Sequence, residues 1–163
     1  MKQERMDNMA AYQQRNHGHS QKPQFNKVDI QFKEETYVSE AEEVIKALAK
    51  KEFKVINNEK KGKNNTDVLT TNQLRQLLSL TSVIYTEAQS SDFDQIIDRL
   101  AYLRVQFVYQ SGRNSAVKKL VELADILSLL KRVQDNKDKK ELIRFCRYME
   151  ALVAYFKYYG GRD

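Results

Sequence analysis

The sequence is poor in cysteine, proline and glycine, and each shortage excludes a class of protein. Its 163 residues include one cysteine, one proline and five glycines. A single cysteine, Cys146, excludes a disulfide framework or a cysteine-rich zinc site and suits a reducing compartment. The scarcity of turn residues disfavours a fold made of many short strands. At about one domain's length, the chain is expected to be a single all-helical domain.

Long hydrophobic runs are also absent from the sequence. No stretch approaches the ~20 apolar residues that span a bilayer. The beginning, MKQERMDNMAAYQQ, does not contain the apolar centre of a secretory signal. We therefore expect a soluble, cytoplasmic protein without membrane contact.

Residues that could support catalysis are few and scattered. The two histidines, His17 and His19, lie in a polar N-terminal stretch, so no pairing with a nucleophilic serine or cysteine is indicated. The sequence contains no glycine-rich phosphate loop and no histidine or acidic cluster typical of a metal site. We predict that the protein is not an enzyme and uses no cofactor or metal.

Positive charge is modest and spread along the chain. Lys and Arg number 28 against 22 Asp and Glu, which gives a formal net charge of +6. Such an excess attracts polyanions without strong preference. A DNA-binding tail would concentrate its bases, so the pattern argues against an isolated DNA-binding regulator.

The chain divides into an N-terminal extension and one helical domain. Residues 1–36 are rich in Gln, Asn, His and Lys and lack helical periodicity, which predicts disorder with a short extended segment at 28–32. Residues 37–163 form the predicted domain. A polar, glycine-containing linker interrupts it at 57–65.

Hydrophobic periodicity and capping signals predict five helices in this domain. Boxes of the Ser/Thr/Asp-x-x-Glu/Gln type precede three of them, at Ser39, Thr70 and Asp138. Because the connections between most of these helices are short, we expect a compact bundle of four to five helices. The predicted helices span 39–54, 71–89, 92–111, 114–133 and 138–159.

The helix predicted at 92–111 has an apolar and a polar side. The apolar side, with residues such as Ile96 and Leu100, is expected to face the core. The polar side mixes guanidinium, phenol and amide groups, which can bind phosphates and stack on bases. A solvated or subunit-packing surface is the simpler interpretation. This side carries Arg99, Tyr102, Gln106, Tyr109 and Arg113.

Arg104 interrupts the apolar side of the same helix, next to Val108. A guanidinium removed from water needs partners, so we expect either an internal ion pair or a role at an interface. The candidate partners are Glu150, Glu122 and Asp125.

The helix predicted at 114–133 is apolar over more than half of its circumference. One contact within a bundle does not need so wide an apolar arc, so a second subunit or two neighbouring helices should cover it. Its N-terminal end combines backbone amides with Lys118 and Lys119, as anion sites do. The same features also match an ordinary corner between two helices.

The last predicted helix has a buried stripe and a side rich in bases and tyrosines. Cys146 lies in the stripe, where we interpret it as a small core residue rather than a nucleophile. The other side is typical of surfaces that follow single-stranded RNA, or else it packs on a neighbouring helix or protomer. It carries Lys140, Arg144, Arg147, Tyr148, Tyr155 and Tyr158.

Three segments taken together resemble a known family. They are TTNQLRQLLSL at 70–80, YLRVQFVYQSGR at 102–113 and FCRYMEALVAYFKYYGG at 145–161. In this order and spacing they resemble the small helical subunit of the type III-A CRISPR (Csm) effector complex. The similarity is strong over 69–163, while the extension at 1–36 lies outside the family pattern.

The resemblance implies a non-catalytic, all-α subunit of an antiviral ribonucleoprotein. Copies of the subunit would stack in a filament beside the backbone subunits and the large subunit, and contact the duplex of CRISPR RNA and target RNA through its backbone. Base pairing by the guide would supply specificity. A helical protein–protein adaptor without RNA contact is the alternative. The residues predicted to bind RNA are Arg113, Lys118, Lys119, Arg99, Tyr109, Arg75, Arg144 and Arg147.

Overall fold

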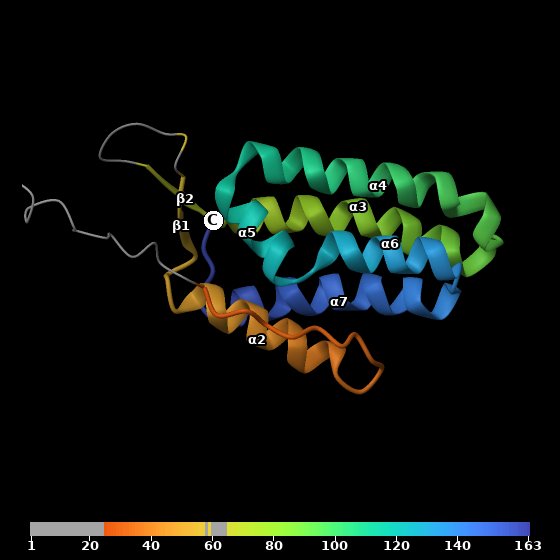
Figure 1. Cartoon of the computed structure of the whole chain (residues 1–163), viewed down its shortest axis with the longest axis horizontal. Helices are drawn as coiled ribbons and strands as arrows, with labels where there is room; N and C mark the ends of the chain where they lie inside the picture. The colour runs from red at the N-terminus through yellow and green to blue at the C-terminus, as the bar shows by residue number, and fades with distance from the viewer. Residues whose placement is uncertain (1–24, 58, 60–64) are drawn as a thin grey trace, which may run out of the picture.

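The computed structural model describes residues 25–57, 59 and 65–163, and within them the chain is mainly helical (Figure 1). The predicted all-α fold class is confirmed, with two short strands in addition: β1 (Lys54–Ile56) pairs with β2 (Thr66–Val68) as an antiparallel hairpin. The helices are α2 (Tyr37–Ala49), α3 (Thr71–Ser90), α4 (Phe93–Arg113), α5 (Ser115–Leu123), α6 (Ile126–Asn136) and α7 (Lys139–Tyr158).

Four helices that run lengthwise form the body of the molecule. These are α3, α4, α6 and α7, while α2 lies against α7 and the hairpin projects from the end at which α5 lies (Figure 1). α3 packs on α4 and α7, and α5 packs on α4, α6 and β1. The hairpin, the end of α4 and the start of α5 therefore share one end of the bundle.

The predicted start of α3 is confirmed in atomic detail. The Thr70 hydroxyl accepts a hydrogen bond from the Gln73 backbone N–H at 3.3 Å, and the Gln73 side chain accepts one from the Thr70 N–H at 2.9 Å. This reciprocal capping box satisfies two of the amides that a helix start leaves without partners. For α7 only half of the predicted box forms, because Asp138 caps the helix while Glu141 binds Arg132 and Asn136 instead.

The predicted bounds of the first helix are wrong at both ends. α2 begins at Tyr37, and Glu42 is not part of a capping box with Ser39 but accepts a hydrogen bond from the Tyr159 hydroxyl at 2.6 Å. This bond, together with Lys46, holds the pKa of Glu42 below its usual value. α2 ends at Ala49, because Glu52 and Phe53 take positive φ angles that turn the chain into β1.

The helix predicted at 114–133 is in fact two helices. The chain breaks between α5 and α6 at Asp125, whose φ of 50° lies in the left-handed region. The Ala124 carbonyl at the break accepts a hydrogen bond from the Tyr148 hydroxyl at 3.3 Å. The wide apolar arc is thereby explained within the chain, because its two halves face different neighbours. α5 packs on α4 and the hairpin, and α6 packs on α4 and α7.

The core follows most of the predicted apolar stripes, and Tyr148 and Val108 are the corrections. Cys146 is buried as expected, and burial raises the pKa of its thiol to about 12. Tyr148, predicted on the exposed side of the last helix, is fully buried, and its ring meets that of Phe32 edge-on with centroids 5.9 Å apart. None of the helices in the described part of the chain is long and apolar enough to cross a membrane.

Part of the predicted disordered extension packs on the bundle. Residues 25–36 are described, no strand forms at 28–32, and Phe32 is fully buried with a φ of 58°. Phe25, Val28 and Ile30 pack against the core at its margin. Residues 1–24, and most of the predicted linker at 57–65, lie outside the described residues.

Candidate nucleic-acid interface

A polar groove forms where the start of α3, the end of α4 and the start of α5 meet. We call it the Arg113 groove, and the side chains that line it are basic or amidic except for two at its base. Such groups can donate to phosphate oxygens and exchange hydrogen bonds with ribose hydroxyls. The lining residues are Gln73, Gln76, Leu77, Gln110, Arg113, Asn114 and Val117.

Arg113 and Tyr109 form the exposed rim of this groove. They lie one helical turn apart on α4, and the Arg113 guanidinium lies 5.5 Å from the centroid of the Tyr109 ring. Tyr109 is 57% exposed. The guanidinium is therefore positioned by the aromatic ring while its N–H groups remain accessible to an anion.

The groove lies between two stretches without acidic residues. Neither residues 68–86 nor residues 99–121 contain an Asp or Glu, and the second stretch contains Arg99, Arg104, Arg113, Lys118 and Lys119. Two such stretches that meet at one end of a bundle favour a positive local potential there, which the buried Asp67 carboxylate beside Ser115 offsets in part. This end is therefore the place where a polyanion would be attracted.

The predicted anion site at the start of α5 is not available, because the protein's own side chains fill it. Asn114 accepts hydrogen bonds from the N–H groups of Ala116 and Val117 at 2.9 and 3.0 Å. The buried carboxylate of Asp67, from β2, accepts one from the Ser115 N–H at 2.9 Å. Because these amides are already bonded, any phosphate at this end must be bound by side chains rather than by the helix start.

Two further predicted residues lie on the helices that line the groove, and a third is partly engaged. Arg75 and Lys118 are exposed and adjacent in sequence to lining residues of α3 and α5. Lys119 pairs with Glu122 at 2.7 Å and lies 5.7 Å from the ring centroid of Phe25. The structure thus gathers Arg113, Tyr109, Arg75 and Lys118 at one end of the molecule.

The remaining α4 arginines do not belong to this group. Arg99 forms an ion pair with Glu87, and its separation of fourteen positions from Arg113 corresponds to ~21 Å along a helix. The predicted ion pair of Arg104 is wrong, since its nearest partner is Gln134 at 3.5 Å and its buried Nε has no partner among the described residues. Its neighbour Val108 faces solvent rather than the core.

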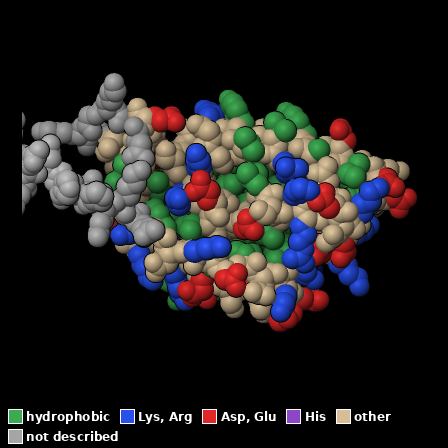
Figure 2. Space-filling view, viewed as in Figure 1, with side chains coloured by type: hydrophobic (Ala, Val, Ile, Leu, Met, Phe, Trp, Pro, Cys, Tyr) green, Lys and Arg blue, Asp and Glu red, His purple; other side chains and the backbone are tan. Residues whose placement is uncertain are grey.

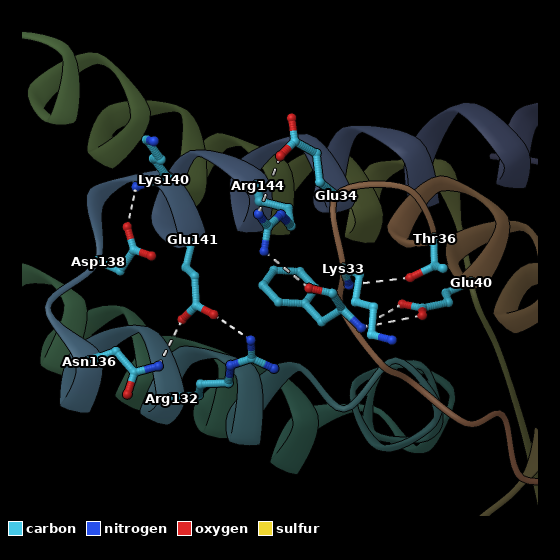
Figure 3. Close-up of polar contacts among 11 residues, drawn as sticks. Lys33, Glu34, Thr36, Glu40, Arg132, Asn136, Asp138, Lys140, Glu141 and Arg144 are labelled. Atoms are coloured by element: carbon cyan, nitrogen blue, oxygen red, sulfur yellow. Dashed lines mark hydrogen bonds and ion pairs between the residues drawn. The ribbon is translucent and has the colours of Figure 1, made fainter.

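Arg144, although predicted to bind RNA, is used inside the fold (Figure 3). It donates a hydrogen bond to the Phe32 carbonyl at 3.2 Å, and its guanidinium lies 5.7 Å from the centroid of the Phe32 ring. Arg132 approaches the same ring at 5.8 Å, and the Glu40 carboxylate accepts a hydrogen bond from the Phe32 N–H at 3.1 Å. We call Phe32 with these partners the Phe32 site. Arg147, one turn further on α7, is exposed.

Sequence reasoning missed the amide side chains of the groove. Gln76 and Gln110 belong to different helices, and nothing in their local sequence distinguishes them from other surface glutamines. Gln73 and Asn114 could be recognised only as helix caps, which they also are. These four amide side chains are recognised as one group only when the starts of α3 and α5 are known to lie beside the end of α4.

Comparison with known proteins gives one consistent result. The family model described as Csm2 Type III-A matches residues 31–162. The chain is 52% identical over 130 residues to a Streptococcus thermophilus protein named CRISPR system Cms protein Csm2. The aligned region covers 80% of this chain and 96% of that relative. A Mycobacterium tuberculosis (strain CDC 1551 / Oshkosh) protein of that name is 46% identical over 134 residues, with coverage of 80% and 96%. One from Enterococcus italicus is 40% identical over 99 residues, or 58% of this chain and 71% of the relative.

Proposed function

This chain belongs to the Csm2 family, the small subunit of the type III-A CRISPR (Csm) complex, and we propose that within that complex it contacts RNA through the Arg113 groove. The ligand is the duplex of CRISPR RNA and target RNA, bound through its sugar-phosphate backbone. The observation that carries the proposal is the exposed Arg113–Tyr109 pair beside an amide-lined groove, which is built from two stretches of chain without acidic residues.

The groove is suited to reading the backbone rather than the bases. Guanidinium and amide groups bind phosphate and ribose in any nucleotide sequence. One guanidinium with a few amides gives weak binding, so useful affinity requires several copies along one duplex. This matches a subunit that stacks in a filament beside the other subunits of an antiviral, cytoplasmic ribonucleoprotein.

We further propose that the subunit does no chemistry itself. Its one thiol, Cys146, is buried, and its raised pKa keeps it protonated at neutral pH. The two histidines, His17 and His19, lie outside the described residues. Cleavage of nucleic acid then belongs to other subunits, and this one holds the duplex in place.

The salt dependence of target binding tests this proposal. In the reconstituted Csm complex, Arg113→Glu should weaken binding of target RNA at low salt and lower the slope of log affinity against log salt by about one unit. The loss should be equal for two unrelated guide sequences, because the backbone is the same. Lys137→Glu, an exposed charge reversal at the other end of the bundle, is the matched control. Unchanged affinity and slope in the Arg113 variant would refute the contact.

A helical adaptor that binds only protein remains the second candidate. It is favoured by the valines that α4 exposes, Val105 and Val108, since apolar surface is typical of protein interfaces. The two functions differ in the length of RNA that the complex protects from nuclease. If omission of this subunit leaves the protected length unchanged, the adaptor interpretation is correct.

A further inference from the structure

The Arg113 groove contains more amide side chains than a phosphate site needs. One cation, Arg113, lines it together with four amides, which are Gln73, Gln76, Gln110 and Asn114. A phosphate oxygen accepts hydrogen bonds and donates none, so donors alone suffice to bind it. A side-chain amide carries an acceptor as well as two donors. The groove can therefore bind a group that itself donates a hydrogen bond.

Two of these amides are fixed by the helix starts. The Gln73 side-chain oxygen accepts a hydrogen bond from the Thr70 N–H at 2.9 Å, at the start of α3. The Asn114 side-chain oxygen accepts from the N–H groups of Ala116 and Val117, at the start of α5. Because these oxygens are engaged, each side chain leaves mainly its NH₂ group to a ligand. The two NH₂ groups thus add to Arg113 as donors to phosphate oxygens.

The other two amides keep both their donors and their acceptor. Gln76 is exposed and Gln110 is half-buried, and neither side chain forms a hydrogen bond within the described part of the chain. Gln76 lies three residues after Gln73 on α3, and Gln110 lies three residues before Arg113 on α4. Residues three apart share one face of a helix. Each of these two walls of the groove therefore carries a donor for phosphate next to an amide whose oxygen is free to accept.

Charge does not distinguish the two kinds of nucleic acid, because RNA and DNA carry the same phosphates. On the face of the molecule shown in Figure 2, basic and acidic side chains are interspersed, and the net charge of the chain is only +6. Any preference for RNA at this groove must therefore come from uncharged contacts.

The group that matches a free amide beside a phosphate is the ribose 2′-hydroxyl. It both donates and accepts hydrogen bonds, DNA lacks it, and an A-form duplex displays it in a wide and shallow minor groove. The volume of the Arg113 groove, about 160 Å³, is below the ~300 Å³ at which small-molecule pockets begin. This size suits a sugar with its phosphate rather than a whole nucleotide.

We propose that Gln76 and Gln110 bind the 2′-hydroxyl of a nucleotide whose phosphate is bound by Arg113, so that the groove distinguishes a ribose from a deoxyribose backbone. An amide oxygen of the pair accepts the hydroxyl proton, and an NH₂ group of the pair donates to the hydroxyl oxygen. This specificity rests on the proposed RNA contact and adds what the phosphate contact does not supply.

Nucleotides with a 2′-fluoro group test the role of the hydroxyl, because they keep the A-form geometry of RNA but lack the hydroxyl proton. In the reconstituted Csm complex, a fully 2′-fluoro target strand is compared with an RNA target of the same sequence, and the ratio of the two dissociation constants is measured. A second series carries the substitution in the guide strand, because the groove meets one strand or the other. The all-RNA duplex should bind more tightly by about two- to tenfold for each nucleotide contacted.

Removal of the two amides should remove this preference. Gln76→Met and Gln110→Met keep the length of the side chain but lack the amide donors and the carbonyl acceptor. The ratio should fall in both variants by about two- to tenfold for each nucleotide contacted. Contacts that other subunits make with 2′-hydroxyls enter every ratio equally and cancel. Gln95→Met, at an exposed glutamine near the other end of α4, is the matched control and should keep the ratio of the unmodified protein.

The outcomes separate the ribose contact from the phosphate contact. Because an uncharged amide releases no counterions, both glutamine variants of the groove should leave the salt slope unchanged, whereas Arg113→Glu should lower it. A lowered slope in Arg113→Glu with unchanged ratios in both groove variants, for both strands, would overturn the ribose contact and leave the phosphate contact intact. A ratio that falls equally in Gln95→Met would also overturn it. An unchanged slope in Arg113→Glu would refute the groove contact as a whole.

Discussion

Arg113 and Arg144 come from faces that look alike in the sequence, yet the fold uses them in opposite ways. Each lies on a helix beside tyrosines and opposite an apolar stripe. In the Phe32 site the Arg144 side chain is 18% exposed and bonded to a backbone carbonyl. In the Arg113 groove the guanidinium contacts the ring of Tyr109 and otherwise faces solvent. The difference shows that a basic face is available to a ligand only where no other part of the chain has reached it.

The largest expected loss of stability comes from removing the aromatic ring at the centre of the Phe32 site. Phe32→Ala should lower the free energy of unfolding by about 3–5 kcal/mol, because a fully buried aromatic ring is removed from between two guanidinium groups and Tyr148. Urea denaturation followed by circular dichroism measures it. Tyr158→Ala, which truncates an aromatic ring that is 79% exposed, should change stability little. Equal losses in the two variants would contradict the packing.

A smaller loss is expected at Arg144 itself. Arg144→Gln should cost about 1–3 kcal/mol of unfolding free energy, because the Phe32 carbonyl loses its charged donor in a buried position. Arg147→Gln, one turn away on α7 and exposed, should stay within about 0.5 kcal/mol of the unmodified protein. The pair separates a structural arginine from a surface one by chemical denaturation. No difference between them would place Arg144 back among the candidates for RNA contact.

The Arg113 groove has a structural residue of its own in Asn114. Asn114→Ala should cost about 1 kcal/mol, because the amides of Ala116 and Val117 lose their acceptor at the start of α5. Thermal denaturation measures this loss, with Asn72→Ala, exposed in the first turn of α3, as the control. A stability unchanged by Asn114→Ala would mean that the start of α5 is open to an anion after all.

The smallest effect on stability is expected at Arg113. Arg113→Gln should change the unfolding free energy by no more than about 0.5 kcal/mol, since the lost contact is one exposed cation–π pair. The same variant should weaken RNA binding by the complex. This combination, a stable subunit with poorer binding, is the opposite of what Arg144→Gln should give. A destabilised Arg113 variant would remove the distinction between the two sites.

Much of the fold could be predicted because it depends on neighbours in the sequence. The bounds of α3 agree with the structure within a residue, since a capping box and a regular apolar stripe both lie inside a single segment. The break at Asp125 could not be predicted, because the Tyr148 hydroxyl that satisfies the Ala124 carbonyl is 24 residues away. The hairpin was missed for the same kind of reason, since its Asp67 is held by Ser115.

The residues of the candidate site differ in the same way: some could be grouped from local sequence, and others make contacts with residues far away in the chain. Tyr109 and Arg113 could be proposed together from the sequence, because they lie on one face of one helix and in a segment that resembles the family. The contacts of Arg144 and Lys119 within the fold could not be predicted, because their partners, Phe32 and Phe25, come from a stretch that reads as disordered. Low hydrophobic content over thirty residues hides the few aromatic side chains that hold such a stretch to a core.

The sequence by itself determined the helical class, the family and the stripes that form the core, because periodicity, caps and motif order are local properties of the chain. Only the tertiary structure decided which cations remain accessible. Hydrogen bonds and ring contacts between residues as far apart as Phe32 and Arg144, 112 positions in the chain, depend on how the helices pack, and no local pattern encodes them.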